Sequence, residues 1–287
     1  MTTEAMSVSP ARPGVDDVLS RRHGENFSVA AAWIPRRERQ LLLAVYAFAR
    51  FVDEIGDASV AGAGDRLEAL ADQLARWPAV PAATAAIAGP MQALAGAGAP
   101  VGPMQRLVEA NLLDQRVHAY ASFPDLLGYC RLSADPVGRL VLWVMDVGDP
   151  VAERLSDAVC SGLQVVEHLQ DVGEDARRGR VYLPADDLAR AGVGEADLQR
   201  NSATPALCRV IGLQAGRAER MLVLGSRLAG MLGGWRRAAV AGYVGGGLAA
   251  VRALDAAGWD VLGRSPRAGR SARAWTTARI ALRGSAR

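Results

Sequence analysis

The chain has 287 residues, 50% of them hydrophobic and 22% charged, and its formal net charge is +3. This balance excludes a disordered or collagen-like protein, and the length is sufficient for a large buried core. The three cysteines are too far apart for a disulfide framework or a zinc spacing, which favours a reducing, cytoplasmic location.

In chain order, residues 1–14 come first, and they lack the basic start and apolar core of a signal peptide. We expect a flexible N-terminal arm there, then one domain over residues 15–263, and a basic tail over 264–287. Within the domain, apolar residues recur at three- and four-residue spacing, and alternating β-branched runs are nearly absent. The protein is therefore predicted to be all-α, with helices near residues 36–57, 64–76, 104–120, 123–146, 150–176, 204–232 and 235–256.

The uncharged stretch 77–105 has the hydropathy of a membrane span but is interrupted by five prolines and several glycines. Because proline removes a backbone donor and clashes with the preceding turn, no continuous helix fits this stretch. We predict a loop-rich connection with one short Ala-rich helix.

The first predicted helix carries a polar stripe on an otherwise apolar surface. Tyr46, Arg50, Asp53 and Asp57 follow the spacing i, i+4, i+7 and i+11, which returns to nearly the same direction on a helix. A helix that is apolar nearly all round is buried, so its carboxylates must face a partner or a polar cavity.

The helix at 150–176 repeats this pattern with Gln164, His168, Asp171 and Asp175, and Glu167 lies at the edge of the stripe. Two such helices facing each other would supply at least four carboxylate ligands, which are the hard oxygen donors that Mg²⁺ prefers. The pattern therefore indicates a magnesium–diphosphate clamp. The alternative is two ordinary solvated faces with local charge pairs.

Residues 245–250 satisfy the dinucleotide-binding pattern G-x-G-x-x-A, but the residues before them are helical in character and no βαβ unit surrounds them. We interpret the run as close helix packing through small residues. No nicotinamide cofactor is expected.

The tail has no acidic residue, and its arginines alternate with Trp275, Ile280 and Leu282. Such a segment suits an anionic membrane surface. The alternative is a flexible, solubilising tail. Nucleic-acid binding is disfavoured because the net charge is low and no recognition motif is present.

Four segments resemble, in order, the signatures of the squalene/phytoene synthase family: 46–57, 129–138, 164–175 and 179–184. The resemblance extends from about Asn26 to Arg264. Residues 25–29, 129–131 and 167–171 are most similar to the bacterial hopanoid-pathway squalene synthases, which convert presqualene diphosphate to hydroxysqualene.

The resemblance implies an isoprenoid synthase fold, a helical barrel around a deep central pocket, with residues 15–263 as the catalytic domain. It also implies more than one Mg²⁺ ion and a prenyl diphosphate substrate. The matching metal ligands are Asp53, Asp57, Asp171 and Asp175. The residues expected near the diphosphate are Ser28, Tyr46, Arg50, Arg180 and Tyr182, and those near the reacting carbons are Tyr129 and Gln164.

Departures from the common family pattern suggest roles for two further residues. Glu167 stands where many relatives have Asn, and we expect it to act as a fifth carboxylate ligand. Gln170 stands where relatives have Arg. His168 would position the water that quenches the carbocation; its alternative role is a hydrogen bond to a carboxylate across the cleft.

Three functions remain open at this point. The first is hydroxysqualene synthesis by ionisation and water capture. The second is head-to-head condensation of two prenyl diphosphates, and the third is a non-catalytic helical scaffold, which the two complete acidic stripes disfavour. The expected partners are pathway enzymes and a membrane surface on the cytoplasmic side.

Overall fold

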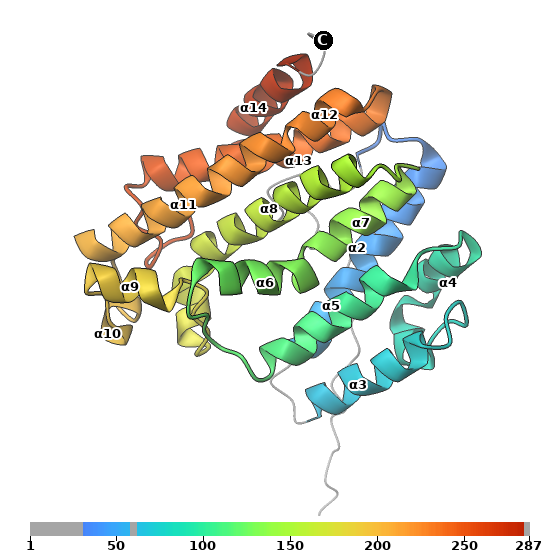
Figure 1. Ribbon diagram of the computed structural model, residues 1–287, viewed down its shortest axis with the longest axis horizontal. Coiled ribbons are helices and arrows are strands. Elements are labelled where there is room, and N and C mark those ends of the chain that lie inside the picture. The colour runs from blue at the N-terminus through green and yellow to red at the C-terminus, as the bar shows by residue number, and fades with distance from the viewer. Residues whose placement is uncertain (1–30, 58–61, 284–287) are drawn as a thin grey trace, which may run out of the picture.

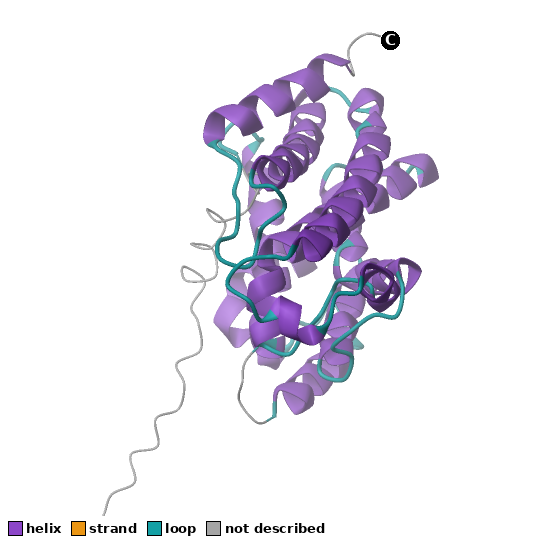
Figure 2. Ribbon diagram, turned by 90° about the vertical axis from the view of Figure 1, so that its left-hand side faces the viewer, coloured by secondary structure: helices purple, strands orange, loops and turns teal. Residues whose placement is uncertain are grey.

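The computed structural model describes residues 31–57 and 62–283, and within them it contains helices and loops but no strand (Figures 1 and 2). The one β contact in this part of the chain is an isolated parallel bridge between Ala119 and Val181. The all-α prediction is confirmed. The predicted arm at 1–14 and the candidate diphosphate ligand Ser28 lie outside the described residues.

The helices before the centre of the chain are α2 (Arg36–Gly56), α3 (Ala63–Leu74), the 3₁₀ helix η2 (Ala82–Ile87), α4 (Ala88–Gly96), α5 (Val101–Asp114), α6 (Phe123–Ser133) and α7 (Asp135–Val144). Those that follow are α8 (Pro150–Arg177), α9 (Ala185–Ala191), α10 (Glu195–Leu198), α11 (Pro205–Gly225), α12 (Arg227–Met231), α13 (Gly234–Ala256) and α14 (Arg270–Arg283).

Three of the long helices begin with a polar cap followed by proline in the first turn. The side chains of Ser122, Asp149 and Thr204 accept hydrogen bonds from backbone N–H groups at the starts of α6, α8 and α11. These caps satisfy donors that have no partner inside the helix, and proline costs nothing there because its missing N–H is not needed.

The predicted helix at 123–146 is wrong in one respect, because the chain forms two helices, α6 and α7, that meet at Ala134. Pro136 explains the break, since proline cannot continue a helix and restricts the residue before it. Similarly, 204–232 divides into α11 and α12, and 77–105 holds η2 and α4 instead of one short helix. The short helices α9 and α10 were not predicted.

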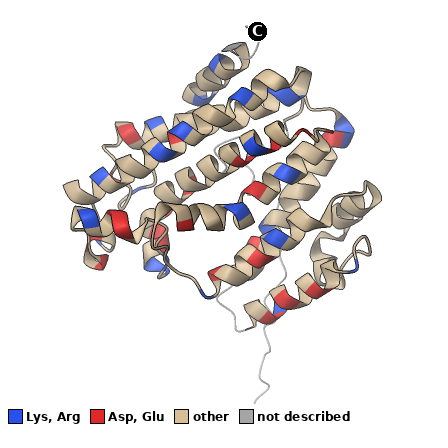
Figure 3. Cartoon of the chain, in the orientation of Figure 1, with Lys and Arg blue, Asp and Glu red and all other residues tan. Residues whose placement is uncertain are grey.

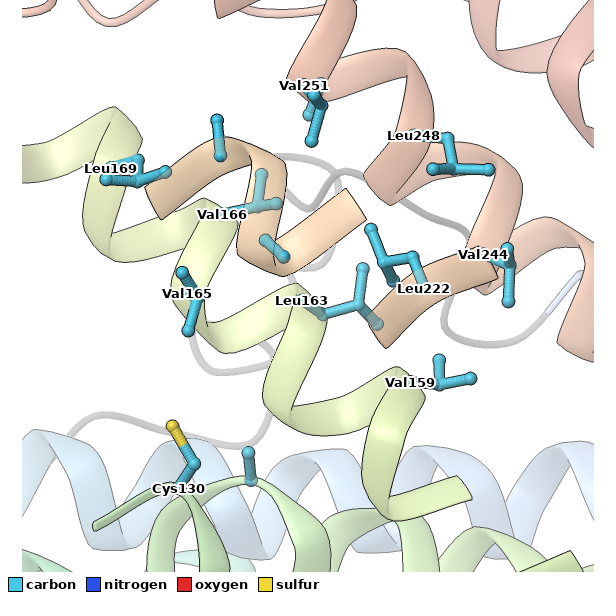
Figure 4. Packing of buried hydrophobic residues seen from close by; sticks show 14 of the residues in the cluster. Cys130, Val159, Leu163, Val165, Val166, Leu169, Leu222, Val244, Leu248 and Val251 are labelled. Carbon is cyan, nitrogen blue, oxygen red and sulfur yellow. The ribbon is translucent and has the colours of Figure 1, made fainter. Parts of the chain in front are cut away.

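The long helix α8 lies in the middle of the molecule and packs against α6, α7, α11 and α13 (Figure 1). Figure 4 shows Val159, Leu163, Val166 and Leu169 of α8 among apolar side chains of α11 and α13. This first hydrophobic cluster holds α8 rigidly, because buried side chains of this kind are close-packed.

A second hydrophobic cluster joins α2 to α3, α4 and α5. Helix α7 contributes to both clusters: Leu140 and Val144 pack in the second, and Leu142 packs in the first. The polar stripes of α2 and α8 therefore belong to two separately packed halves, which α7 connects.

The glycine run lies in the interior of α13, where neighbouring helices approach closely. A Cβ atom on Gly245 would lie 2.7 Å from the Cα of Thr277 in α14, and one on Gly247 would lie 2.7 Å from Leu163 of α8. The interpretation of this run as helix packing through small residues is confirmed.

Most of the basic tail is ordered as α14, which packs on α13. Thr276 and Ile280 are buried, and Arg252 of α13 donates a hydrogen bond to the Thr276 hydroxyl at 3.1 Å. The alternative of a flexible tail is therefore wrong for residues 270–283. None of the described helices combines the length and the apolar character needed to cross a membrane.

Candidate active site

The polar stripe of α2 faces α5. Asp53 Oδ1 accepts a hydrogen bond from the Asn111 side chain at 3.2 Å, and Arg50 Nη1 lies 3.9 Å from Asp53 Oδ2. Asp57 follows the last residue of the helix. Burial raises the pKa of Asp53 to about 6, against the lowering effect of Arg50. A nearby cation would stabilise the ionised form of a carboxylate in this position.

The polar stripe of α8 contains two carboxylates and a pair of hydrogen-bonded side chains. Gln164 Nε2 and His168 Nε2 are 3.1 Å apart, and His168 Nδ1 lies 4.0 Å from Asp175 Oδ2. Burial and then the charge of Asp171 raise the pKa of Asp175 to about 7. Burial thus disfavours the ionised form of the second pair of carboxylates, as it does for Asp53.

Arg180 joins the two halves of the site. Gly179, at φ 76°, turns the chain out of α8, and the Val181 N–H fixes the new direction by donating to the His118 carbonyl at 2.7 Å. Arg180 Nη1 then donates a hydrogen bond to Asp57 Oδ1 at 2.8 Å. The structure therefore brings together Asp57 and Arg180, two site residues that were predicted from separate motifs.

A buried aspartate on α5, which the sequence did not reveal, organises the tyrosines. The Tyr129 hydroxyl donates to Asp114 Oδ2 at 2.6 Å, and the Tyr182 hydroxyl lies 3.5 Å from Asp114 Oδ1. Burial raises the pKa of Asp114, while the Tyr129 hydrogen bond and Arg180 lower it. The available signal was that Asn111 and Asp114 follow the apolar Leu107 at i+4 and i+7, on the same side of the helix.

Aromatic rings enclose the space next to His168. The ring centroids of His168 and Tyr182 are 3.7 Å apart in a stacked arrangement, and Tyr129 and Tyr120 pack around them. Burial, with a further contribution from Arg180, lowers the pKa of His168 to about 3, so the imidazole is neutral at neutral pH. The hydrogen-bond partner of His168 is Gln164 on its own helix, not a carboxylate across the cleft.

An apolar cavity of about 120 Å³ adjoins the polar stripes. It lies among α2, α7, α8 and α13, and its walls include Tyr46 and Leu163, the neighbour of Gln164. Tyr46 is buried, and Glu167 is half-buried on α8. This cavity provides a water-poor environment at the Tyr46 end of the α2 stripe, about two helical turns before Asp53.

The start of the tail also reaches the second stripe. The buried Gln170 side chain donates to the Pro266 carbonyl at 2.7 Å. Burial and then Glu174 raise the pKa of Asp171, and Arg267, next to Pro266, opposes them. Arg267 was predicted only as part of the basic tail, because the sequence does not show that this segment returns to α8.

The donor set fits magnesium shared with a diphosphate. Within residues 31–57 and 62–283, no group of three or more His, Cys, Asp or Glu side chains lies close enough to hold a metal ion by itself. Each stripe instead offers two carboxylates, and burial raises the pKa of Asp53 in the first and of Asp175 in the second. Mg²⁺ in phosphate-processing sites takes one or two carboxylates plus phosphate oxygens and water. The residues that would hold the ions are Asp53, Asp57, Asp171 and Asp175.

Comparison with known proteins identifies the family of this chain. Residues 20–274 match the family model described as squalene/phytoene synthase. The hydroxysqualene synthase of Rhodopseudomonas palustris is 37% identical over 217 residues, which cover 74% of this chain and 73% of that protein. The chloroplastic phytoene synthase 1 of Arabidopsis thaliana is 30% identical, covering 68% of this chain and 48% of that protein.

Solved structures show the same fold. The squalene synthase HpnC from Alicyclobacillus acidocaldarius is 39% identical and superposes with a TM-score of 0.75, covering 84% of this chain and 92% of that one. A dehydrosqualene synthase, at 20% identity and a TM-score of 0.80, supports the fold alone. The chain belongs to the squalene/phytoene synthase family of enzymes.

Proposed function

We propose that the protein converts presqualene diphosphate and water to hydroxysqualene and diphosphate. The observation that carries this proposal is the Arg180–Asp57 hydrogen bond, which brings a cation from the end of α8 to the first acidic stripe. A diphosphate bound between the stripes would lie close to the Arg180 cation and to the first acidic stripe. The similarity to proteins named hydroxysqualene synthase supports the choice of substrate within the family.

We assign the diphosphate to the region between the two acidic stripes. Arg50 and Arg180 would contact its oxygens, and Tyr46, Tyr182 and Ser28 would complete its surroundings, as the family resemblance implies. Two or more Mg²⁺ ions bound there would offset the negative charge that develops on the departing diphosphate. Burial already disfavours the ionised forms of Asp53 and Asp175, so both carboxylates favour a bound cation.

The reaction begins when the carbon–oxygen bond breaks and both electrons leave with the diphosphate. The remaining cyclopropylcarbinyl cation opens, a water oxygen adds to it, and a proton is released. Tyr129 and Tyr182 pack against each other beside the α8 stripe, and a tyrosine face turned to the substrate would stabilise positive charge. The neutral imidazole of His168 would orient the attacking water by accepting a hydrogen bond from it.

The hydrocarbon part of the substrate would occupy the apolar cavity. At about 120 Å³ this cavity is narrow, so its side chains would have to move apart when the substrate binds. An apolar wall also limits the number of water molecules that reach the cation.

Head-to-head condensation of two prenyl diphosphates is the second candidate. It is favoured by the similarity to phytoene synthases and by the same pair of acidic stripes. Two substrates would require two diphosphate positions.

We place the enzyme in the cytoplasm, at the inner face of the membrane, because its product would be a water-insoluble triterpene alcohol. Enzymes that make presqualene diphosphate or consume the alcohol would be its neighbours. The absence of acidic residues after Asp260 supports contact with an anionic surface.

The test is incubation of the purified protein with presqualene diphosphate and Mg²⁺, without a nicotinamide cofactor, followed by mass spectrometry of the extracted lipids. We expect an alcohol of squalene mass plus oxygen and release of diphosphate. Consumption of farnesyl diphosphate with no turnover of presqualene diphosphate would replace the proposal with the condensing activity.

A further inference from the structure

A groove of about 490 Å³ lies between α14 and the helices α11, α12 and α13. We call it the basic groove, and its lining includes Val223, Arg227, Met231, Arg252, Thr276 and Arg279. It lies among the last four helices, away from the acidic stripes of α2 and α8.

The groove carries three arginines and a single acid, Glu219, among its lining residues. Figure 3 shows basic but no acidic residues on α14. The guanidinium groups of Arg252 and Arg279 lie 5.3 Å and 4.5 Å from the ring centroid of Trp275. These cation–π contacts hold both charges at the same edge of the groove.

Exposed apolar side chains border these charges. Trp275 is 55% exposed, Leu282 70%, Val223 53% and Met231 46%. Trp275 and Leu282 are seven positions apart on α14, so they point in nearly the same direction, while Thr276 and Ile280 face the protein. Solvent-exposed tryptophan and leucine next to arginine are typical of a surface that enters the boundary between lipid head groups and acyl chains.

We propose that this face docks on an anionic lipid bilayer, with Arg227, Arg252 and Arg279 contacting phosphate groups and Trp275 and Leu282 entering the interface. Guanidinium groups match phosphate oxygens in geometry and charge. No described helix is long and apolar enough to cross a membrane. The proposal extends the proposed function, because a bound enzyme would release its triterpene product next to the bilayer. The residues that line the basic groove lie on four helices, only one of which belongs to the basic tail.

Flotation of the full-length protein with lipid vesicles tests the proposal. The vesicles are phosphatidylcholine alone or phosphatidylcholine mixed with phosphatidylglycerol. We expect flotation with the anionic vesicles, and at least about tenfold weaker partitioning for the double variant Arg227→Glu/Arg279→Glu, since each basic residue near an anionic surface adds to binding. The double variant Trp275→Ala/Leu282→Ala should also partition more weakly onto the anionic vesicles, and this difference from the wild type should persist at high salt.

The matched control is Arg66→Glu/Arg76→Glu, which changes the net charge equally. These arginines lie in α3 and just after it, at the opposite edge of the molecule (Figure 1). Equal flotation of the two charge-reversed variants would overturn the proposal, as would flotation with neither type of vesicle. A groove that instead receives a protein would leave vesicle binding unaffected by the Trp275→Ala/Leu282→Ala change.

Turnover in detergent separates this proposal from the proposed function. Detergent-solubilised presqualene diphosphate needs no bilayer, so Arg227→Glu/Arg279→Glu should retain the wild-type rate while losing flotation. Flotation without turnover of that substrate would reject only the proposed reaction and leave the docking surface intact.

Discussion

Arg180 and Asp57 are 123 positions apart in the chain, yet Arg180 Nη1 donates a hydrogen bond to Asp57 Oδ1 at 2.8 Å. This contact links the segment after α8 to the end of α2. It also places the Arg180 charge where it lowers the pKa of Asp114 and Asp175, whose ionised forms are disfavoured by burial. Arg180 thus connects three helices of the site, α2, α5 and α8, through charge.

Replacement of Arg180 by alanine should lower kcat/KM for presqualene diphosphate by about 100-fold, the typical loss when one group that stabilises a developing negative charge is removed. Arg180→Lys should keep part of the activity, because it keeps the charge but not the planar donor geometry. Steady-state kinetics at saturating Mg²⁺ provide the measurement.

The control for this change is Arg200→Ala, which removes an exposed arginine from a loop outside the site. It should leave kcat/KM within about twofold of the wild type, as expected for surface substitutions. If Arg180→Ala behaved in the same way, Arg180 would have no contact with the leaving diphosphate.

His168→Ala should change the product. Loss of the neutral imidazole removes the group that orients water, so the share of hydroxysqualene should fall relative to products formed by proton loss. Mass spectrometry of the lipid extract measures this ratio, with the exposed His118→Ala as the matched control. The same alcohol formed at the same rate by His168→Ala would leave His168 only structural contacts, its packing against Tyr182 and its hydrogen bond with Gln164.

Glu167→Ala should raise the Mg²⁺ concentration that gives half-maximal activity, if Glu167 is a fifth carboxylate ligand. The effect should appear in this concentration more than in the rate at saturating Mg²⁺, because excess metal restores occupancy. Titration of activity with Mg²⁺ gives this concentration for the wild type and for the variant. Superimposable curves would remove Glu167 from the metal ligands.

The two acidic stripes were predictable because helical spacing alone puts Asp53 with Asp57 and Asp171 with Asp175. The partners that organise them were harder to find. Asp114 lies on α5, and its importance depends on the Tyr129 hydroxyl, which reaches it from another helix. Arg267 lies near the second stripe, in a segment that the hydrogen bond from Gln170 to the Pro266 carbonyl ties to α8. Such contacts depend on how loops return to the core, which periodicity in the sequence does not contain.

The stability of the protein should depend on the ionisation of Asp135. Its carboxylate is buried and accepts a hydrogen bond from Ser161 at 2.8 Å, and burial raises its pKa from 3.8 to about 7. A raised pKa in the folded state means that folding favours the protonated form. The contribution is therefore fully present below about pH 4 and is lost as the pH rises to about 7.

Asp135→Asn should remove this dependence, since the amide oxygen still accepts from Ser161 and carries no charge. Relative to the wild type, the variant should gain stability between about pH 4 and pH 7, by an amount on the order of a few kcal/mol. Denaturant unfolding across this range gives the difference, and Asp72→Asn on the exposed side of α3 controls for net charge. A constant difference at all pH values would show that Asp135 does not titrate there.

Gly245→Ala should destabilise the protein by about 1 to 3 kcal/mol, the usual cost of overpacking, because the added methyl group would lie 2.7 Å from the backbone N and Cα of Thr277. Backbone atoms cannot rotate away, so α14 must move.

Gly242→Ala is the matched control on the same helix: its methyl group meets nothing within 4 Å, and alanine there should stabilise the protein by about 0.4 to 1 kcal/mol. Denaturant unfolding gives both values, and limited proteolysis should cut α14 faster in Gly245→Ala alone. Equal stability of the two variants would mean that α14 is not packed against α13 in solution, and the basic groove between them would then lack a rigid wall.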